Sequence, residues 1–140
     1  MEKPKHFLSE SAKWKSKSEF MDAEGNAVMF FGESRIKVSG KSISNKSWAM
    51  AGEKMIENDY AITPLSDTRF QSISQNPTLG IQKGYFDING DTLFSRFFIE
   101  GSLMAGFEVI HREGDICYSE GALYNGDDLI NTWKAKMTKE

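Results

Sequence analysis

The fold class is decided by one stretch, Ala12–Phe20 (AKWKSKSEF), whose side chains alternate strictly in character. Small, hydroxyl-bearing or aromatic residues fill the even positions, and lysines and a glutamate fill the odd positions. Successive side chains of a β-strand point to opposite faces, so this period of two predicts a strand with one packed and one solvated side. Residues 129–138 repeat the pattern, because Leu129, Asn131, Trp133, Ala135 and Met137 alternate with Lys134 and Lys136.

Turn signals such as Asn89-Gly90 and Asn125-Gly126 recur between these two stretches at the spacing typical of a sandwich or barrel. We predict an all-β chain, a single antiparallel up-and-down meander barrel of about ten strands, with residues 1–140 as one domain. Pairing of the first and last strands would leave no exposed sheet edge. Residues 5–12 are the one candidate for a short helix, which would cover a barrel end. The expected strands are 12–20, 27–38, 42–50, 54–62, 67–74, 79–88, 91–100, 103–112, 115–124 and 129–138.

Composition excludes several classes of protein. The net charge is only −3, with both signs interspersed, which argues against a nucleic-acid partner. No apolar run is long enough to span a membrane as a helix. Cys117 is the only cysteine, and no apolar segment follows Met1, so we expect a cytoplasmic protein without disulfides.

Sequence motifs for catalysis and metal binding are absent. Ser39-Gly40-Lys41-Ser42 contains the end of a phosphate-binding loop, but Arg35 stands where its first glycine belongs, so we interpret it as a turn. The two histidines, His6 and His111, lie far apart in the sequence and do not form a zinc-binding motif. We therefore expect no metal and no cofactor, and the sequence leans against an enzyme without excluding one.

Hairpin geometry predicts which strand faces point inward in the second half. If Asn89-Gly90, Gly101-Ser102 and Glu113-Gly114 are two-residue loops and 125–127 is a three-residue loop, cross-strand partners fall into rows. One row holds Gly84, Ser95, Glu108, Ser119 and Trp133, and the next holds Gln82, Phe97, Gly106, Gly121 and Asn131. This face carries a single mid-strand charge, Glu108, and burying unpaired charges is costly, so we predict that it points inward.

The glycines and serines of this face would leave a cavity instead of a filled core. The predicted ligand-binding residues are Trp14, Gln82, Ser95, Phe97, Met104, Glu108, Ser119 and Trp133. The ligand would be a small hydrophobic or amphipathic molecule. Two alternatives stay open: the tryptophans simply fill a core, or the barrel is an isomerase- or lyase-type enzyme that uses Glu108 for acid–base chemistry.

The opposite face is strongly aromatic, and we interpret it as the outside. Its large apolar side chains would form a patch suited to a homodimer interface or to another protein partner. The residues expected in the homodimer are Phe94, Phe98, Phe107 and Tyr118. If the faces are inverted instead, Arg96, His111 and Glu120 would form the interior site and could carry the acid–base chemistry.

With Trp14 in the first strand and Trp133 in the last, the chain resembles the calycins: lipocalins, fatty-acid-binding proteins and nitrobindin-like barrels. Lipocalins have Gly-x-Trp where this chain has Ala12-Lys13-Trp14. The Arg-x-Tyr pair of fatty-acid-binding proteins is replaced by Asn131-Thr132-Trp133, and no histidine follows His111 to match the haem ligand of nitrobindin-like proteins. The resemblance therefore implies a fold and a ligand-binding habit, but no particular ligand.

Overall fold

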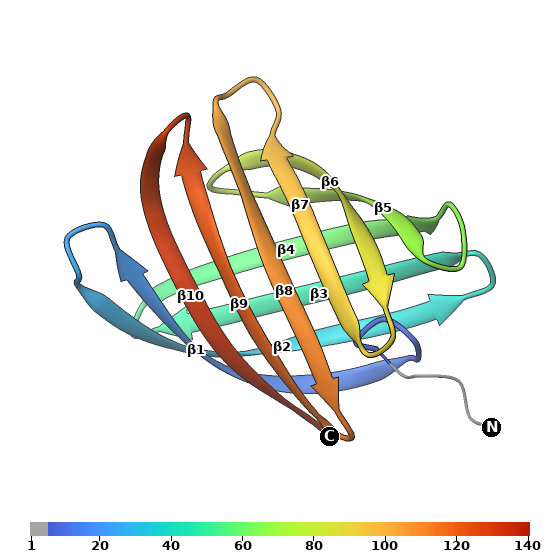
Figure 1. Cartoon of the computed structure of the whole chain (residues 1–140). Helices are drawn as coiled ribbons and strands as arrows, with labels where there is room; N and C mark the ends of the chain where they lie inside the picture. The colour runs from blue at the N-terminus through green and yellow to red at the C-terminus, as the bar shows by residue number, and fades with distance from the viewer. Residues whose placement is uncertain (1–5) are drawn as a thin grey trace.

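Ten antiparallel strands form a closed barrel in the computed structural model, which describes residues 6–140 (Figure 1). Each strand pairs with its neighbours in sequence, and β1 pairs with β10, which confirms the predicted up-and-down meander. Figure 1 shows β7–β10 crossing β2–β4 at a steep angle, as two walls of one barrel. The strands are β1 (Ala12–Asp22), β2 (Ala27–Ser39), β3 (Ser42–Ala51), β4 (Lys54–Pro64), β5 (Arg69–Asn76), β6 (Gly80–Asn89), β7 (Thr92–Ile99), β8 (Met104–Glu113), β9 (Ile116–Asn125) and β10 (Asp128–Lys139).

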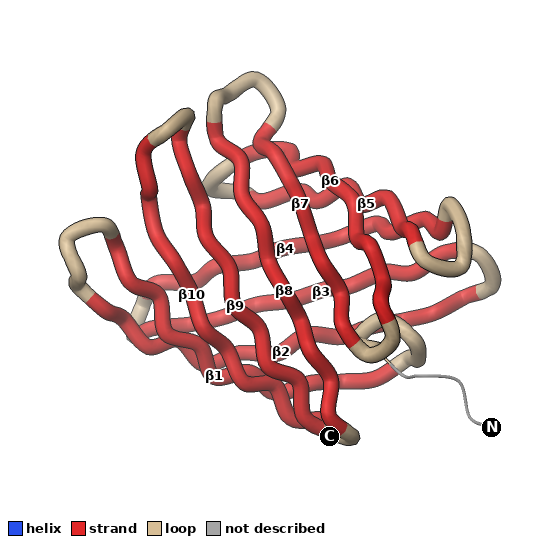
Figure 2. The backbone as a smooth tube through the Cα atoms, viewed as in Figure 1, coloured by secondary structure: helices blue, strands red, loops and turns tan. Residues whose placement is uncertain are grey.

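The segment before β1 is a turn, so the candidate helix over residues 5–12 is wrong for the described residues (Figure 2); Lys5 lies outside them. The Ser9 backbone N–H donates to the His6 carbonyl oxygen at 3.1 Å, and no helical ladder follows. Phe7 and Leu8 are nevertheless buried in the core. The segment therefore covers a barrel end as expected, with a different backbone conformation.

One end of the barrel is closed by apolar packing. Trp14 lies there between Phe7, at a ring distance of 5.7 Å, and the Arg112 guanidinium, 5.0 Å from its ring. Burial of this many apolar side chains supplies the main stabilisation of the fold. The cluster consists of Phe7, Leu8, Trp14, Ile36, Ile43, Ile62, Phe70, Phe86, Leu93, Ile110, Cys117 and Met137.

Arg112 fixes the N-terminal segment to this closed end. Its Nε donates to the Gly114 carbonyl at 2.8 Å, and its two terminal nitrogens reach the His6 carbonyl at 3.2 Å and Glu10 Oε1 at 2.8 Å. Lys139 also donates to Glu10 Oε1, at 2.9 Å. These contacts hold the pKa of Glu10 near 2, chiefly through the hydrogen bonds from Lys139 and Arg112.

Three of the four predicted hairpin registers are wrong by two residues. In the β6–β7 and β8–β9 turns glycine takes the first loop position instead of the second. In the β9–β10 pair a two-residue loop shifts the register by one residue, and an irregularity between Leu129 and Asn131 shifts it by one more. In the β6–β7 turn Asn89 pairs with Thr92, which leaves Gly90-Asp91 as the loop, with Gly90 at a φ of 64°. This is the position that a type II′ turn gives to glycine. Glu113 likewise pairs with Ile116, and Asn125 with Asp128. Only the β7–β8 pairing, Ser95 with Glu108, has the predicted register.

A shift of two residues leaves every side chain on its predicted face, since the strand period is two. The predicted rows are therefore displaced, but the inward face is correct. The observed row contains Ser95, Glu108, Gly121 and Trp133, whereas Ser119 pairs with Ala135.

Candidate functional site

We infer an internal hollow in the half of the barrel opposite the closed end. Inward-facing side chains there remain partly accessible, although the closed wall of strands separates them from the outer surface. Accessible surface on the inner wall requires space that side chains do not fill. The hollow lies toward the β1–β2, β3–β4, β5–β6, β7–β8 and β9–β10 turns, on the left and top of Figure 1. The partly accessible inward residues include Phe20, Ala49, Asn58, Tyr60, Gln82, Phe97, Met104, Glu108, Asn131 and Trp133.

Glu108 is the polar centre of this hollow. Trp133 Nε1 donates to its Oε2 at 2.6 Å, and Ser119 Oγ donates to the same oxygen at 3.2 Å. Burial raises the pKa of Glu108 above its usual range, while these two hydrogen bonds act in the opposite direction. Trp133 reaches the carboxylate because Gly121 stands between them in the row, and a Cβ on Gly121 would collide with the indole.

Aromatic rings form the wall around Glu108. The Trp133 ring lies 6.4 Å from Phe97 and 5.9 Å from Phe20, whose ring is 5.1 Å from Phe30. Gly106 leaves room for Phe97, since a Cβ there would be 2.6 Å from Phe97 Cζ. The wall can therefore receive an apolar ligand body.

A polar row on β3–β6 also faces the interior. Asn45 pairs with Tyr60, Tyr60 with Ser74, and Ser74 with Gln82. The pKa of Tyr60 is raised, first by burial and then by the charge of Glu108, while a hydrogen bond with Gln82 opposes the shift. Glu108 and the polar row are therefore close enough to interact electrostatically.

Sequence reasoning missed three members of this row: Asn45, Tyr60 and Ser74. It extended registers only through the second half of the chain. The turns at Gly40 and Gly52 carry the same signal, a glycine at the first loop position, with φ of 59° and 62°. Extending the registers through these turns would have placed Asn45 opposite Tyr60.

The predicted site residues divide into two groups. Gln82, Phe97, Met104, Glu108, Ser119 and Trp133 lie together on the inner wall, with Ser95 buried beside Glu108 in the same row. Trp14 does not join them, because it is fully buried in the apolar cluster of the closed end.

The faces are not inverted, so the alternative interior site is not assembled. Arg96 is 70% exposed on the outer surface, and Glu120 is also exposed. His111 lies outside as well, where its Nδ1 is 3.0 Å from Thr92 Oγ1 and 3.3 Å from Asp91 Oδ1. The physical reason is the cost of burying three charged groups, which the observed faces avoid.

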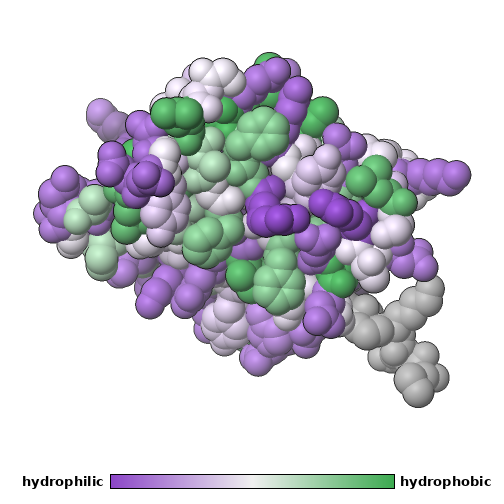
Figure 3. All heavy atoms as spheres, turned by 45° about the horizontal axis from the view of Figure 1, so that its top comes forward, coloured by the Kyte–Doolittle hydropathy of each residue, from purple (hydrophilic) through white to green (hydrophobic). Residues whose placement is uncertain are grey.

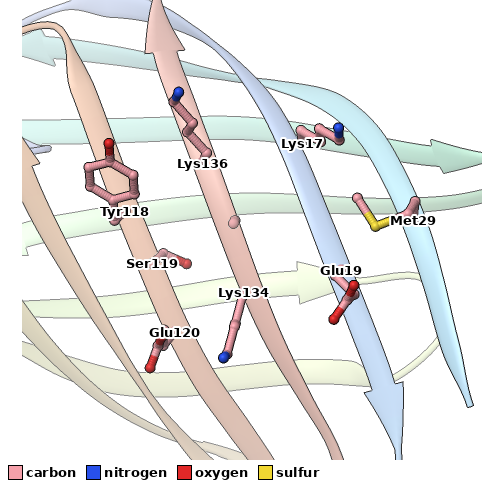
Figure 4. Close-up of a pocket in the computed structure, with 9 residues that line it drawn as sticks. Lys17, Glu19, Met29, Tyr118, Ser119, Glu120, Lys134 and Lys136 are labelled. Atoms are coloured by element: carbon pink, nitrogen blue, oxygen red, sulfur yellow. The ribbon is translucent and has the colours of Figure 1, made fainter.

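A shallow hollow of about 320 Å³ lies on the outer surface over β1, β2, β9 and β10 (Figure 4). Its charges alternate along the register, since Glu19 pairs with Lys134 and Lys134 with Glu120. Such interleaved exposed charges are typical of a solvated barrel wall and contribute little binding energy. Of the two hollows, the interior one has the chemistry of a site.

Metal binding finds no support in the described chain, where no three His, Cys, Asp or Glu residues are grouped to hold an ion. Residues 6–140 contain no helix of the length and apolarity that a membrane crossing requires.

Two solved structures share this architecture. Rv2717c from M. tuberculosis superposes with a TM-score of 0.74 at 11% identity, covering 93% of this chain and 92% of its own. The S-type phycobiliprotein lyase CPES from Guillardia theta gives a TM-score of 0.69 at 9% identity, covering 93% and 88%. No family model and no curated protein matches the chain. At these identities the likeness shows the fold, which is a calycin-like barrel.

Proposed function

We propose that this protein binds a small amphipathic molecule inside its barrel. The observation that carries the proposal is Glu108, a carboxylate in the interior that is hydrogen-bonded to Trp133 and Ser119 and still partly accessible. A mostly apolar pocket with a few convergent polar groups is the usual form of a ligand site. The ligand's apolar body would contact Phe97, Trp133 and Met104, and its polar group would meet Glu108 and Gln82.

A cavity-filling variant tests this proposal. Ala49 faces the hollow from β3, whereas Ala61 faces outward from β4. The neutral naphthalene dye Prodan, whose emission shifts to the blue in apolar surroundings, should bind the wild type and Ala61→Phe equally. Ala49→Phe should bind it at least roughly tenfold more weakly, because the added ring occupies the ligand's volume. Equal binding to all three proteins would place the dye elsewhere and contradict the proposal.

An enzymatic role is the second candidate, and the raised pKa of Glu108 favours it. A carboxyl group whose pKa is raised by burial can act as a general acid or base on a molecule held beside it. In this version Glu108→Gln would abolish turnover and leave binding of a neutral ligand intact.

We also propose that the protein is a cytoplasmic homodimer. The outer aromatic residues Phe94, Phe98, Phe107 and Tyr118 are 43–48% exposed. Figure 3 shows apolar side chains gathered on one face beside strongly hydrophilic ones. An exposed apolar patch suits a protein interface, here with a second copy. The cytoplasmic location is supported by the single, buried Cys117.

A further inference from the structure

In the middle of the barrel interior, Glu108 is the one charged side chain among the described residues. The other described charged residues of the inward face lie at the barrel ends, Arg112 and Lys139 at the closed end and Asp22 and Lys54 at the open rim. Arg112 is buried and its guanidinium is committed to Gly114, His6 and Glu10. The cation nearest the open end, Lys54, lies at the rim over the ring of Phe30, 6.0 Å from its centroid. In the middle of the hollow a ligand therefore meets the carboxyl group of Glu108, while the described cations of the inward face stand at the two ends of the barrel.

The carboxylate of Glu108 can accept further hydrogen bonds. Both described hydrogen bonds, from Trp133 and Ser119, end on Oε2. A carboxylate offers about four acceptor positions over its two oxygens, so Oε1 remains free for a donor from the ligand.

The polar row adds further acceptors without partners. Asn45 Oδ1 and Ser74 Oγ in this row are buried without a hydrogen-bond partner among the described residues, and so is Asn131 Oδ1 on β10. Asn45 is only 9% exposed and Ser74 only 1%. Buried polar groups of this kind normally find partners, so the row is arranged for a donor-bearing guest.

The aromatic wall favours the same charge. The ring of Trp133, which donates to Glu108, lies between the rings of Phe97 and Phe20 on the inner wall. Aromatic faces attract cations through the ring quadrupole, and the attraction grows where water is excluded.

From these features we infer that the ligand is an amphipathic amine, whose protonated nitrogen pairs with Glu108 and whose apolar body packs on the Trp133–Phe97 wall. This inference rests on the proposed function and narrows it to one ligand chemistry. A carboxylate-bearing lipid would face Glu108 across the same hollow and is disfavoured by like-charge repulsion. Burial destabilises the ionised form of Glu108, and the described part of the protein places no cation beside it. The protonated amine of the ligand would supply that positive charge.

Three probes with one apolar body test the inference: decylamine, decanol and decanoate, each measured at neutral pH by displacement of bound Prodan. Decylamine should displace the dye from the wild type at a concentration roughly tenfold or more below that of decanol, with decanoate the weakest. Glu108→Gln should remove the advantage of the amine, so that decylamine and decanol displace the dye at similar concentrations. Glu120→Gln, which removes an outer carboxylate, should keep the wild-type order.

The outcomes separate the inference from the proposed function. If decanol displaces Prodan while decanoate equals or exceeds decylamine, the amine is excluded and the barrel remains a ligand-binding protein. Retention of the amine preference in Glu108→Gln would likewise overturn the role of Glu108. If neither Prodan nor any of the three probes binds, both the inference and the proposed function fail.

Discussion

At the scale of single residues, Glu108 links stability to function. Its pKa is raised because burial disfavours the ionised form more than Trp133 and Ser119 stabilise it. The folded protein therefore binds the Glu108 proton more tightly than the unfolded chain does. The protonated Glu108 side chain therefore favours the folded state at a pH below its pKa in the unfolded chain. This advantage is lost as the pH rises through its pKa in the folded protein.

Glu108→Gln should therefore stabilise the barrel at pH 8 by roughly 1–3 kcal/mol, the range for relieving an incompletely paired buried polar group. The difference between variant and wild type should shrink toward zero below about pH 4.5, where the wild-type carboxyl is protonated in both states. Urea unfolding of both proteins at pH 4 and pH 8 measures the two differences. A variant that is less stable than the wild type at pH 8 would show that the ionised carboxylate has better partners than those described.

At the scale of secondary-structure elements, the sequence predicted the strands better than the turns. Alternation such as that of Ala12–Phe20 depends on local chemistry, so all ten strands were placed within a few residues. The sequence predicted loops at Asn89-Gly90, Glu113-Gly114 and residues 125–127, but the structure uses Gly90-Asp91, Gly114-Asp115 and Gly126-Asp127 instead. Glycine fits both type I′ and type II′ turns, so the local sequence does not distinguish these registers. The predicted inner face is nevertheless correct, because each register error adds up to two residues; in the β9–β10 pair the loop supplies one and the irregularity between Leu129 and Asn131 the other.

Residues brought together across the barrel were harder to predict. Tyr60 and Glu108 come from β4 and β8, and their interaction follows from barrel closure instead of from any local pattern. Trp14 was assigned to the site because inward-facing residues do not reveal which end of the barrel is filled. The N-terminal segment that covers that end has no strand or helix pattern.

The attachment of this segment to β8 through Arg112 gives a testable prediction. Arg112→Ala should cost about 3 kcal/mol of unfolding free energy, because it removes the donor to the His6 carbonyl, removes one of the donors to Glu10 and uncovers Trp14. Arg96→Ala, which removes an exposed arginine from β7, should change it by less than about 0.5 kcal/mol. Chemical denaturation compares the two variants. Equal effects would mean that the segment contributes nothing to the closure of the barrel.

The hydrogen bonds of Glu10 with Arg112 and Lys139 also predict that the free energy of unfolding depends on pH in the acidic range. The pKa of Glu10 is lowered to about 2. Its ion pairs therefore stabilise the fold above the ordinary pKa of a glutamate, and this stabilisation is lost as the pH falls from about 4.5 toward 2. Arg112→Ala should therefore lose less stability than the wild type over this range.

At the scale of the whole molecule, the outer aromatic patch predicts assembly. Arg96 lies between Phe94 and Phe98 on β7 and pairs with Phe107, and Glu120 on β9 pairs with Val109, so the two charged residues stand within the apolar patch. The wild type should sediment as a dimer and Phe107→Glu as a folded monomer, since a charge in the interface is costly to desolvate. Phe31→Glu provides the control, because Phe31 is 57% exposed on β2, outside the patch, and should leave the dimer intact. A monomeric wild type would contradict the proposed homodimer.

The central claim, that the barrel interior binds a small molecule, is tested most directly by the indole N–H resonances of the three tryptophans. Trp133 faces the hollow, Trp14 is buried at the closed end, and Trp48 lies on the outer surface. In a two-dimensional ¹⁵N–¹H NMR titration with decanol, the Trp133 resonance should shift and saturate, because the ligand disturbs its 2.6 Å hydrogen bond to Glu108. The Trp14 and Trp48 resonances should stay in place. A Trp133 resonance that does not move while Trp48 shifts would put the ligand outside the barrel and contradict the claim.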